Sequence, residues 1–276
     1  MRFAMLYICA TPIGNIEDIT LRVLRILKEV DHVIAEDTRH TRKLLSHYQI
    51  QTSLISMHQH NEAERTEQVI ELIKQGKTLA LVSDAGMPGI SDPGGRLVQR
   101  MIEENLPFTV LPGASALTTA VVHCGLNTSK FLFVGFLPRR NSLQRKELEG
   151  LKNLEATLVF YESPHRLSVT LNNIYQVLGD RYCAVMRELT KKFEEVRRGL
   201  LTEHLQYFAA TEPRGEFVIA VEGYKESNKP AEKEVDIREA VKNLIKEGVT
   251  KKDAIKMVAR ERKLSKNEVY QEVLDL

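Results

Sequence analysis

The sequence LALVSDAGMPGISDPGG, residues 79–95, decides how the first half of this chain folds. Its apolar start predicts a buried strand over residues 79–83. The thirteen residues 83–95 hold four glycines, two prolines and two aspartates, more than a simple reversal of the chain requires. Open α/β sheets bind ligands at the carboxyl ends of their strands, where glycine leaves backbone N–H groups accessible. We therefore expect this loop to form part of a ligand site.

Short apolar runs alternate with amphipathic stretches on both sides of this segment, the pattern of βα units around a parallel sheet. The patterns predict further strands at residues 6–10, 32–36 and 108–111, with helices at 20–30, 64–74 and 95–104 and one ending at Gly125. A second unit begins near Phe131, with strands at 131–138, 157–161, 182–188 and 216–223 and with helices from Ser142 and after His165. Strands are frequent enough there to predict a mixed sheet.

The length of 276 residues fits two domains with an appendage. We expect an α/β domain over residues 1–124, a second α/β domain over 125–224, a linker over 225–234 and a three-helix tail over 235–276. The linker is polar and contains Pro230. Thr250 and Ser265 start capping-box patterns in the tail. The tail resembles a helix-turn-helix in outline, but a packing or dimer element explains it equally well.

The composition, 43% hydrophobic and 28% charged, is that of a globular protein. Cys9, Cys124 and Cys183 stand far apart in apolar settings, which predicts reduced core residues and no metal site. No stretch approaches 18 apolar residues, so we expect a cytoplasmic protein without a membrane segment. The net charge of +2 is too small to predict a nucleic-acid partner. An RNA-binding surface would have to be formed by local clusters of basic residues.

Two further turns follow predicted strands and share the glycine-rich character of residues 83–95. They are ATPIGN at residues 10–15 and PGAS at 112–115. Neither they nor the long loop match the fingerprints for dinucleotides or nucleoside triphosphates. The three turns would form a ligand site if they met at one cleft. Any one of them could instead be an ordinary connection between a strand and a helix.

The segment AEDTRHTRKLL, residues 35–45, places Glu36 and Asp37 directly after a predicted strand. One interpretation is an ordinary helix start, where acidic residues suit the helix dipole and the basic residues form local pairs. The other gives Asp37 or Glu36 a proton-accepting or orienting role, with Arg39, Arg42 and Lys43 holding phosphates.

The segment YESPHR, residues 161–166, also follows a predicted strand and crowds Glu162, His165 and Arg166 into one turn. Basic pairs elsewhere would suit RNA, or would form a solvated face, with Phe136 and Phe193 available for stacking on an unpaired base. These pairs are Arg139 with Arg140, Arg145 with Lys146, Lys191 with Lys192, and Arg197 with Arg198.

Together these segments resemble the tetrapyrrole methylase superfamily, and within it the ribosomal RNA small subunit methyltransferase I family. The resemblance is carried, in order, by TPIGNIEDIT, AEDTRHTRKLL, LVSDAGMPGISDPG, PGASA, GFLPR, FYESPHR and GEFVIAVEG, which span nearly all of residues 6–224. It implies a two-domain tetrapyrrole-methylase-like α/β fold, to which the small C-terminal helical extension is added.

The resemblance also implies S-adenosylmethionine as cofactor, bound between the two domains. The residues that it assigns to the cofactor are Pro12, Gly14, Asp84, Ala85, Gly86, Ile90, Ser115, Ala116, Glu162 and Gly215. The sequence departs from the tetrapyrrole enzymes, which usually have Gly-Asp-Pro where Ala85, Gly86 and Met87 stand. The assignment of the loop is therefore firmer than that of single contacts.

The family's reaction is methyl transfer to the ribose 2′-oxygen of a cytidine in the decoding region of 16S ribosomal RNA, by enzymes that commonly form homodimers. Such a transfer needs the hydroxyl aligned and its proton removed. We expect Asp37 to accept the proton and Arg39 to orient the phosphate or ribose, without a metal ion. A methyltransferase acting on a small tetrapyrrole and a non-catalytic RNA-binding assembly protein are the alternatives.

Overall fold

The computed structural model describes residues 4–225, 236–262 and 264–274. Its contacts divide the chain into one unit that ends at Tyr224 and a second that begins at Lys225. The expected linker, residues 225–234, lies outside the described residues except for Lys225.

The first sheet is wholly parallel, with strand order β3-β2-β4-β1-β5. Its strands are β1 (Met5–Cys9), β2 (His32–Ala35), β3 (Ser53–Ser56), β4 (Thr78–Val82) and β5 (Phe108–Leu111). All five residues of β4 are buried, which agrees with a central strand covered on both faces. Because the strands are parallel, the turns that follow β1, β2, β4 and β5 meet at one edge of the sheet.

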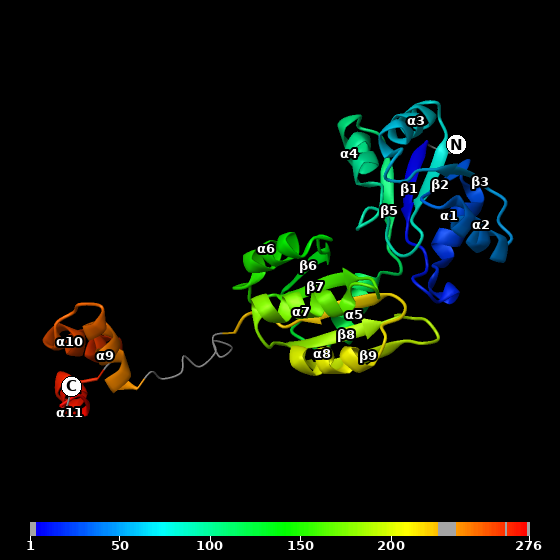
Figure 1. The fold of residues 1–276 in the computed structure, drawn as a ribbon. Coiled ribbons are helices and arrows are strands. Elements are labelled where there is room, and N and C mark those ends of the chain that lie inside the picture. The colour runs from blue at the N-terminus through cyan, green and yellow to red at the C-terminus, as the bar shows by residue number, and fades with distance from the viewer. Residues whose placement is uncertain (1–3, 226–235, 263, 275–276) are drawn as a thin grey trace. The chain divides into compact units, whose positions relative to one another are not determined.

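Four helices cover this sheet, two on each face (Figure 1). They are α1 (Leu21–Glu29) and α2 (Thr38–His47) on one face, and α3 (Glu62–Lys74) and α4 (Gly95–Glu103) on the other. A short 3₁₀ helix, Ile16–Asp18, precedes α1. Thr20 caps α1, as the sequence predicts, because its side chain accepts a hydrogen bond from the Val23 N–H.

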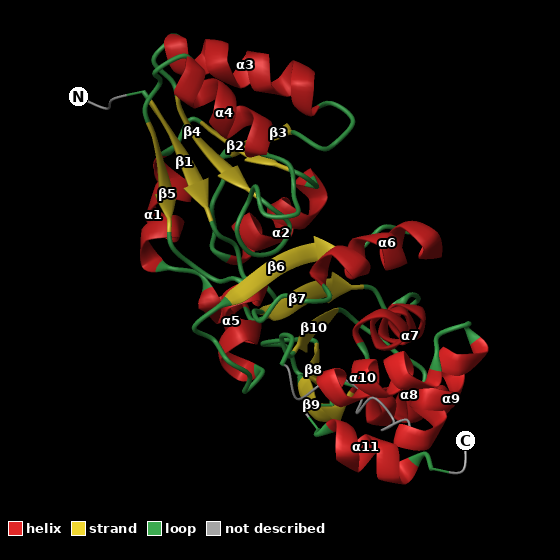
Figure 2. Cartoon of the chain, turned by 90° about the vertical axis from the view of Figure 1, so that its left-hand side faces the viewer, coloured by secondary structure: helices red, strands yellow, loops and turns green. Residues whose placement is uncertain are grey.

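The second sheet is mixed, as expected, with strand order β6-β7-β10-β8-β9. Its strands are β6 (Phe131–Phe136), β7 (Thr157–Glu162), β8 (Tyr182–Arg187), β9 (Glu195–Leu200) and β10 (Phe217–Val221). One face packs against α6 (Asn141–Leu151), α7 (Leu167–Leu178) and α8 (Leu201–Ala210). Figure 2 shows these helices on one side of the sheet.

The opposite face of the second sheet is covered by α5 (Ala116–His123). Ala120, Val121 and Cys124 share a core with Val159 of β7 and Val218 of β10. This helix precedes the domain boundary that we expect at residue 124, yet its buried side belongs to the second sheet. The chain thus passes from one sheet to the other between β5 and α5.

Strands β3 and β9 and helix α8 have no counterpart in the sequence prediction. Strand β3 is short and lies at a sheet edge with none of its residues fully buried. Strand β9 carries two arginines, and the sequence therefore offered it as a basic cluster and not as an edge strand. Pairing with a neighbour makes these segments strands, and a single sequence does not show that pairing.

The second unit contains the three predicted short helices, α9 (Ile237–Lys246), α10 (Lys251–Glu261) and α11 (Lys266–Glu272). Thr250 accepts a hydrogen bond from the Asp253 N–H, and Ser265 forms the complete capping box with Glu268. Val241, Val258 and Val269 are buried in a core made from all three helices. The predicted helix starts are confirmed.

Cys9, Cys124 and Cys183 are buried and unpaired, which confirms their prediction as reduced core residues. In the described part of the chain, no helix is long and apolar enough to cross a membrane.

Candidate functional site

A cavity of about 350 Å³ in the first unit lies where the turns of the first sheet meet one face and edge of the second. This volume is within the range of small-molecule sites. Its lining is mostly apolar, with a few carboxyl and hydroxyl groups. The lining residues are Ile13, Ala85, Gly86, Met87, Ile90, Ser91, Asp92, Ser115, Ala116, Phe136, Tyr161, Glu162, Ser163, Pro164, Met186, Leu189, Glu216, Phe217 and Val218.

The loop 83–95 is held in place by the turn after β1. Thr11 and Gly86 exchange two backbone hydrogen bonds, of 2.9 and 3.0 Å. The Thr11 hydroxyl also donates to the Ser83 carbonyl at 3.0 Å. Gly86 has φ +80° and lines the cavity, so a side chain there would be strained and would occupy ligand space. Two of the turns that the sequence singled out are therefore joined at the site.

The third turn places the N-terminus of α5 at the cavity. Ser115 is the N-cap residue of α5 but makes no side-chain capping bond, and both Ser115 and Ala116 line the cavity. The first N–H groups of a helix have no partner within the helix and favour negative charge. This corner of the cavity is therefore suited to a carboxylate.

A group of carboxyl side chains gives another part of the site negative charge. One of them, Asp92, lies in the cavity wall. Burial raises the pKa of Asp92 to about 6, with added repulsion from Glu36 and Asp84 and a smaller opposing effect of a Ser83 hydrogen bond. Burial also raises the pKa of Glu36, and the negative charge of Asp84 raises it further. Ser91, beside Asp92, has φ 64°, a left-handed conformation that is uncommon away from glycine. The strained backbone and the raised pKa mark Asp92 as a functional candidate.

The sequence pattern did not point to Asp92, although Asp92 lies in loop 83–95, which the sequence predicts to form part of a ligand site. The sequence favours Asp37 because it directly follows a predicted strand, whereas Asp92 stands deep inside a loop whose course a sequence pattern does not reveal.

Asp37 and Arg39 do not line the cavity. Asp37 is the N-cap of α2, where its Oδ1 accepts from the Arg39 N–H at 2.8 Å, and its Oδ2 lies 2.9 Å from Arg39 Nη2. Hydrogen bonds from the Arg39 side chain and backbone lower the pKa of Asp37 to about 2. Arg39 is 86% exposed. These contacts are those of the helix-start interpretation of this segment.

Asp84 supports the loop without lining the cavity itself. Its Oδ1 accepts from the Asp37 N–H at 3.1 Å, which ties the loop after β4 to the start of α2. At the other end of the loop, the Gly94 N–H donates to Glu62 Oε1 at 2.9 Å.

Glu162 lines the cavity but has a fully buried side chain. Its Oε1 accepts from the Ser163 N–H at 2.8 Å, and its Oε2 accepts from the Thr170 hydroxyl at 2.6 Å and lies 3.4 Å from Arg166 Nη2. Arg166 also donates to the Leu137 and Pro138 carbonyls. This network fixes the turn YESPHR, and His165 is exposed and outside the cavity lining.

Pro12, Gly14 and Gly215 lie one residue away from cavity-lining residues. A Cβ on Gly14 would lie 2.3 Å from Lys191 Cγ, and one on Gly215 would lie 2.6 Å from the Glu188 side chain. Lys191 Nζ in turn donates to Glu188 Oε1 at 2.9 Å. Both glycines therefore allow close packing around one ion pair at the edge of the site.

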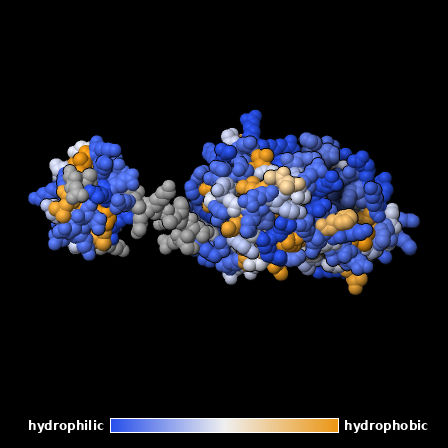
Figure 3. All heavy atoms as spheres, turned by 60° about the horizontal axis from the view of Figure 1, so that its bottom comes forward, coloured by the Kyte–Doolittle hydropathy of each residue, from blue (hydrophilic) through white to orange (hydrophobic). Residues whose placement is uncertain are grey.

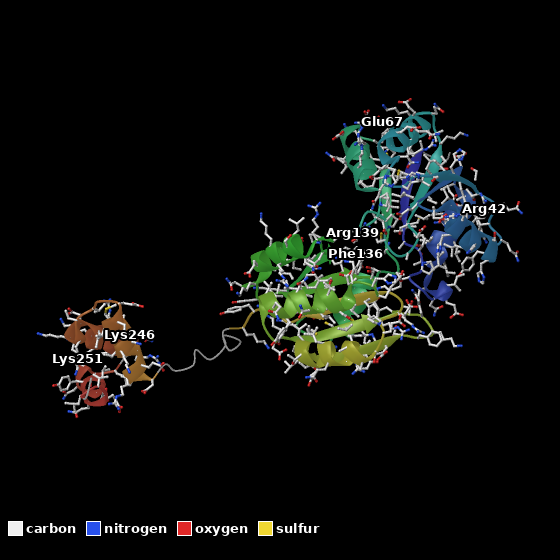
Figure 4. The ribbon with its side chains drawn as sticks, in the orientation of Figure 1. Arg42, Glu67, Phe136, Arg139, Lys246 and Lys251 are labelled. Atoms are coloured by element: carbon white, nitrogen blue, oxygen red, sulfur yellow. The ribbon has the colours of Figure 1, made fainter. Side chains whose placement is uncertain are left out.

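Six of the twelve residues that the sequence assigned to the site line the cavity, namely Ala85, Gly86, Ile90, Ser115, Ala116 and Glu162. Several lining residues from the second sheet were missed, because Met186, Phe217 and Val218 look like ordinary strand residues in the sequence. Phe136, chosen for stacking, is 55% exposed and does line the cavity, in edge contact with Tyr161. Figure 4 shows Phe136 and Arg139 on the same segment of the second α/β half.

Several of the predicted basic pairs are occupied by contacts within the protein. Arg197 stacks on the Tyr207 ring at 3.5 Å, and Arg198 donates to the Cys124 carbonyl at 3.2 Å. Arg145 donates to Asn173 Oδ1 at 2.9 Å. Arg139 and Arg140 are exposed near the cavity-lining Phe136, as Arg42 is on α2.

The chain matches the family model of the tetrapyrrole (corrin/porphyrin) methylases over residues 5–204. It is 46% identical to a protein of Halalkalibacterium halodurans, over 96% of this chain and 93% of that protein, and 44% identical to one of Bacillus subtilis, over 96% and 92%. Both relatives are named ribosomal RNA small subunit methyltransferase I.

Solved structures show likeness of fold at low identity. Uroporphyrin-III-C-methyltransferase of Thermus thermophilus gives a TM-score of 0.56 at 20% identity, over 79% of this chain and 94% of that one. Diphthine synthase gives 0.61 at 14% identity, over 79% and 90%.

Proposed function

Since the chain belongs to the tetrapyrrole (corrin/porphyrin) methylase family, we propose that it methylates the ribose 2′-oxygen of a cytidine in the decoding region of 16S ribosomal RNA. The family and the fold agree with the expected resemblance, and the chain is a methyltransferase whose cofactor is S-adenosylmethionine. The names of relatives that are more than 40% identical over nearly the whole chain support ribosomal RNA as substrate.

The cavity carries the proposal, because its residues fit this cofactor. When bound, S-adenosylmethionine supplies a methyl group on a positively charged sulfonium sulfur. Ile13, Ile90 and Leu189 offer apolar surface, and the N–H groups at the start of α5 suit a carboxylate. The Asp92 carboxyl suits a cation, because its repulsion with Glu36 and Asp84 is relieved by positive charge.

We assign cofactor contact to the six predicted residues that line the cavity and give the other four supporting places. Asp84 holds the loop, Gly14 and Gly215 allow close packing around the Lys191–Glu188 ion pair, and Pro12 directly precedes the cavity-lining Ile13. Small residues at positions 85, 86, 115 and 116 leave room for the ligand.

We propose Asp92 as the group that accepts the proton of the ribose hydroxyl. It lies in the cavity wall with a pKa raised to about 6, which suits a base at neutral pH. Asp37, the acceptor expected from the sequence, has a pKa of about 2 and pairs with Arg39 outside the cavity lining, so it is the weaker base. Arg39 keeps its proposed place as a phosphate contact on α2, since it is largely exposed.

We propose that the RNA reaches the cavity beside Phe136, which can stack on an unpaired base, with Arg139 and Arg140 contacting phosphates. The substrate would be the small ribosomal subunit, encountered in the cytoplasm by a homodimer. We propose the domain limits 1–124 and 125–224. Helix α5, at the end of the first domain, packs against the sheet of the second.

The first test is titration calorimetry with S-adenosylmethionine, followed by transfer of a radiolabelled methyl group to small subunits that lack their modifications. We expect binding, and label at one 2′-O-methylcytidine after nuclease digestion. Binding with label on a tetrapyrrole alone would favour the small-molecule alternative. Absence of cofactor binding would favour the non-catalytic RNA-binding alternative.

Gly86→Val is expected to weaken cofactor binding roughly tenfold or more, since a loss of about 1.4 kcal/mol in contacts corresponds to tenfold in affinity. A Cβ at Gly86 would lie 3.3 Å from Ile13 Cγ2, within the cavity wall. Calorimetry at fixed temperature measures the change.

Gly76→Val is the matched control. Gly76 has φ +89°, like the φ +80° of Gly86, but an added Cβ meets nothing within 4 Å. Both variants should unfold at a lower temperature through backbone strain, and only Gly86→Val should lose cofactor affinity. Equal affinities in the two variants would place the ligand elsewhere.

A further inference from the structure

The second unit carries an open concavity lined mainly by lysines. Lys251, Lys252 and Lys256 come from α10, and Lys266, Asn267 and Tyr270 come from α11, with Ile255 at the base. Tyr270 is 46% exposed. Four ammonium groups beside an accessible aromatic ring form a surface of the kind that binds nucleic acid.

The charge of these lysines is not balanced by neighbouring acids. In the part of the chain that the structure describes, none of the four forms an ion pair within 4 Å. Asp253 and Glu268, two of the carboxylates on the same helices, take part in helix capping. Asp253 Oδ2 accepts from the Thr250 hydroxyl at 2.7 Å, and Glu268 Oε2 accepts from the Ser265 N–H at 2.7 Å.

The positions of Lys251 and Lys252 do not favour the helix itself. They are the first two residues of α10, where the helix dipole disfavours positive charge. Helix stability therefore does not explain them, whereas an external anion would. The face of this unit shown in Figure 3 is mostly hydrophilic, with apolar side chains scattered between polar ones.

We propose that this concavity binds the phosphate backbone of RNA through Lys251, Lys252, Lys256 and Lys266, with Tyr270 stacking on an unpaired base. The inference rests on the proposed function for its choice of RNA as the polyanion. It gives the helical extension a place in substrate binding and none in the chemical step. We call these four lysines and Tyr270 the tail surface.

The test compares two double variants of the full chain. Lys252→Ala/Lys256→Ala removes two charges from the tail surface, and Lys242→Ala/Lys246→Ala removes two exposed charges from α9, outside the concavity. Lys246 and Lys251 are labelled in Figure 4. Alanine favours helix in all four positions, so both variants should fold.

The probe is a protein-free transcript of the decoding region of 16S ribosomal RNA, with small subunits as the second probe. We expect the tail-surface variant to bind the transcript about tenfold more weakly at 0.15 M salt. Its slope of log affinity against log salt should fall by about 1.5, as two lost phosphate contacts predict. The α9 variant should change affinity less than twofold, and both should bind S-adenosylmethionine normally.

Wild-type affinity and salt slope in the tail-surface variant, or an equal loss in the α9 variant, would overturn the proposal. So would a loss of binding to subunits with unchanged binding to the transcript, because the contact would then be with ribosomal protein. RNA binding is read independently of methyl transfer, so a failure of the proposed reaction would be seen separately.

Tyr270 has its own pair of variants. Tyr270→Ala should weaken binding roughly fivefold or more through lost stacking, and Tyr270→Phe should restore it. Equal binding by the two variants and the wild type would remove the ring from the surface.

Discussion

Asp92→Asn is expected to slow methyl transfer by about 10²- to 10⁴-fold, the usual contribution of a positioned proton acceptor. The amide has nearly the same shape as the carboxyl group but cannot take the proton of the ribose hydroxyl. Single-turnover transfer to small subunits, at saturating cofactor, measures the effect on the chemical step. Cofactor affinity, measured by calorimetry, should change by a few fold at most.

The pH dependence gives a second view of the same group. A base acts in its ionised form, so the rate should fall as the pH drops below the pKa of Asp92, about 6 in the free protein. Glu36, Asp84 and Tyr161 are the titratable groups that interact with Asp92, and the first two help to raise its pKa. A bound sulfonium would lower that pKa, so the acidic limb should lie at or below pH 6 and be absent from Asp92→Asn.

Asp37→Asn is the matched control, because asparagine is also a good N-cap and preserves the start of α2. We expect it to retain turnover within tenfold. If Asp37→Asn instead abolishes transfer while Asp92→Asn does not, the acceptor that the sequence suggested is the correct one. Near-normal turnover in both variants would mean that alignment, without a protein base, accounts for the rate.

Arg181→Met is expected to destabilise the first unit by about 3–5 kcal/mol, because it removes three hydrogen bonds from a charged donor, each worth roughly 1–3 kcal/mol. Arg181 is 2% exposed. Its guanidinium donates to the carbonyls of Lys152, Leu178 and Glu222 at 2.5, 3.1 and 3.3 Å, and lies 5.9 Å from the Tyr224 ring. Methionine fills similar volume but leaves three carbonyl groups without these donors.

Arg181 ties together the ends of α6, α7 and β10, so its loss should weaken the whole second sheet. Thermal unfolding should shift down by about 10 °C, since each kcal/mol corresponds to roughly 2–4 °C in a unit of this size. Arg139→Met, at an exposed position, should shift it by less than 2 °C. An unchanged midpoint in Arg181→Met would show that water replaces the guanidinium without loss.

The sequence by itself determined most of the helices and strands of this protein and the loops that line its cavity. Apolar runs placed β4 and β10, and Thr20, Thr250 and Ser265 marked helix starts correctly, because these features depend on residues close together in the chain. The glycine-rich loop at 83–95 was recognised for the same reason. The order of the motifs then indicated the family.

Only the tertiary structure decided which residues share the site and in what chemical state. Asp92 has its raised pKa because folding buries it and brings the charges of Glu36 and Asp84 near it. Edge strand β9 and buried Arg181 likewise depend on partners distant in the chain. Burial and charge act between neighbours in space, and a single sequence orders neighbours only along the chain.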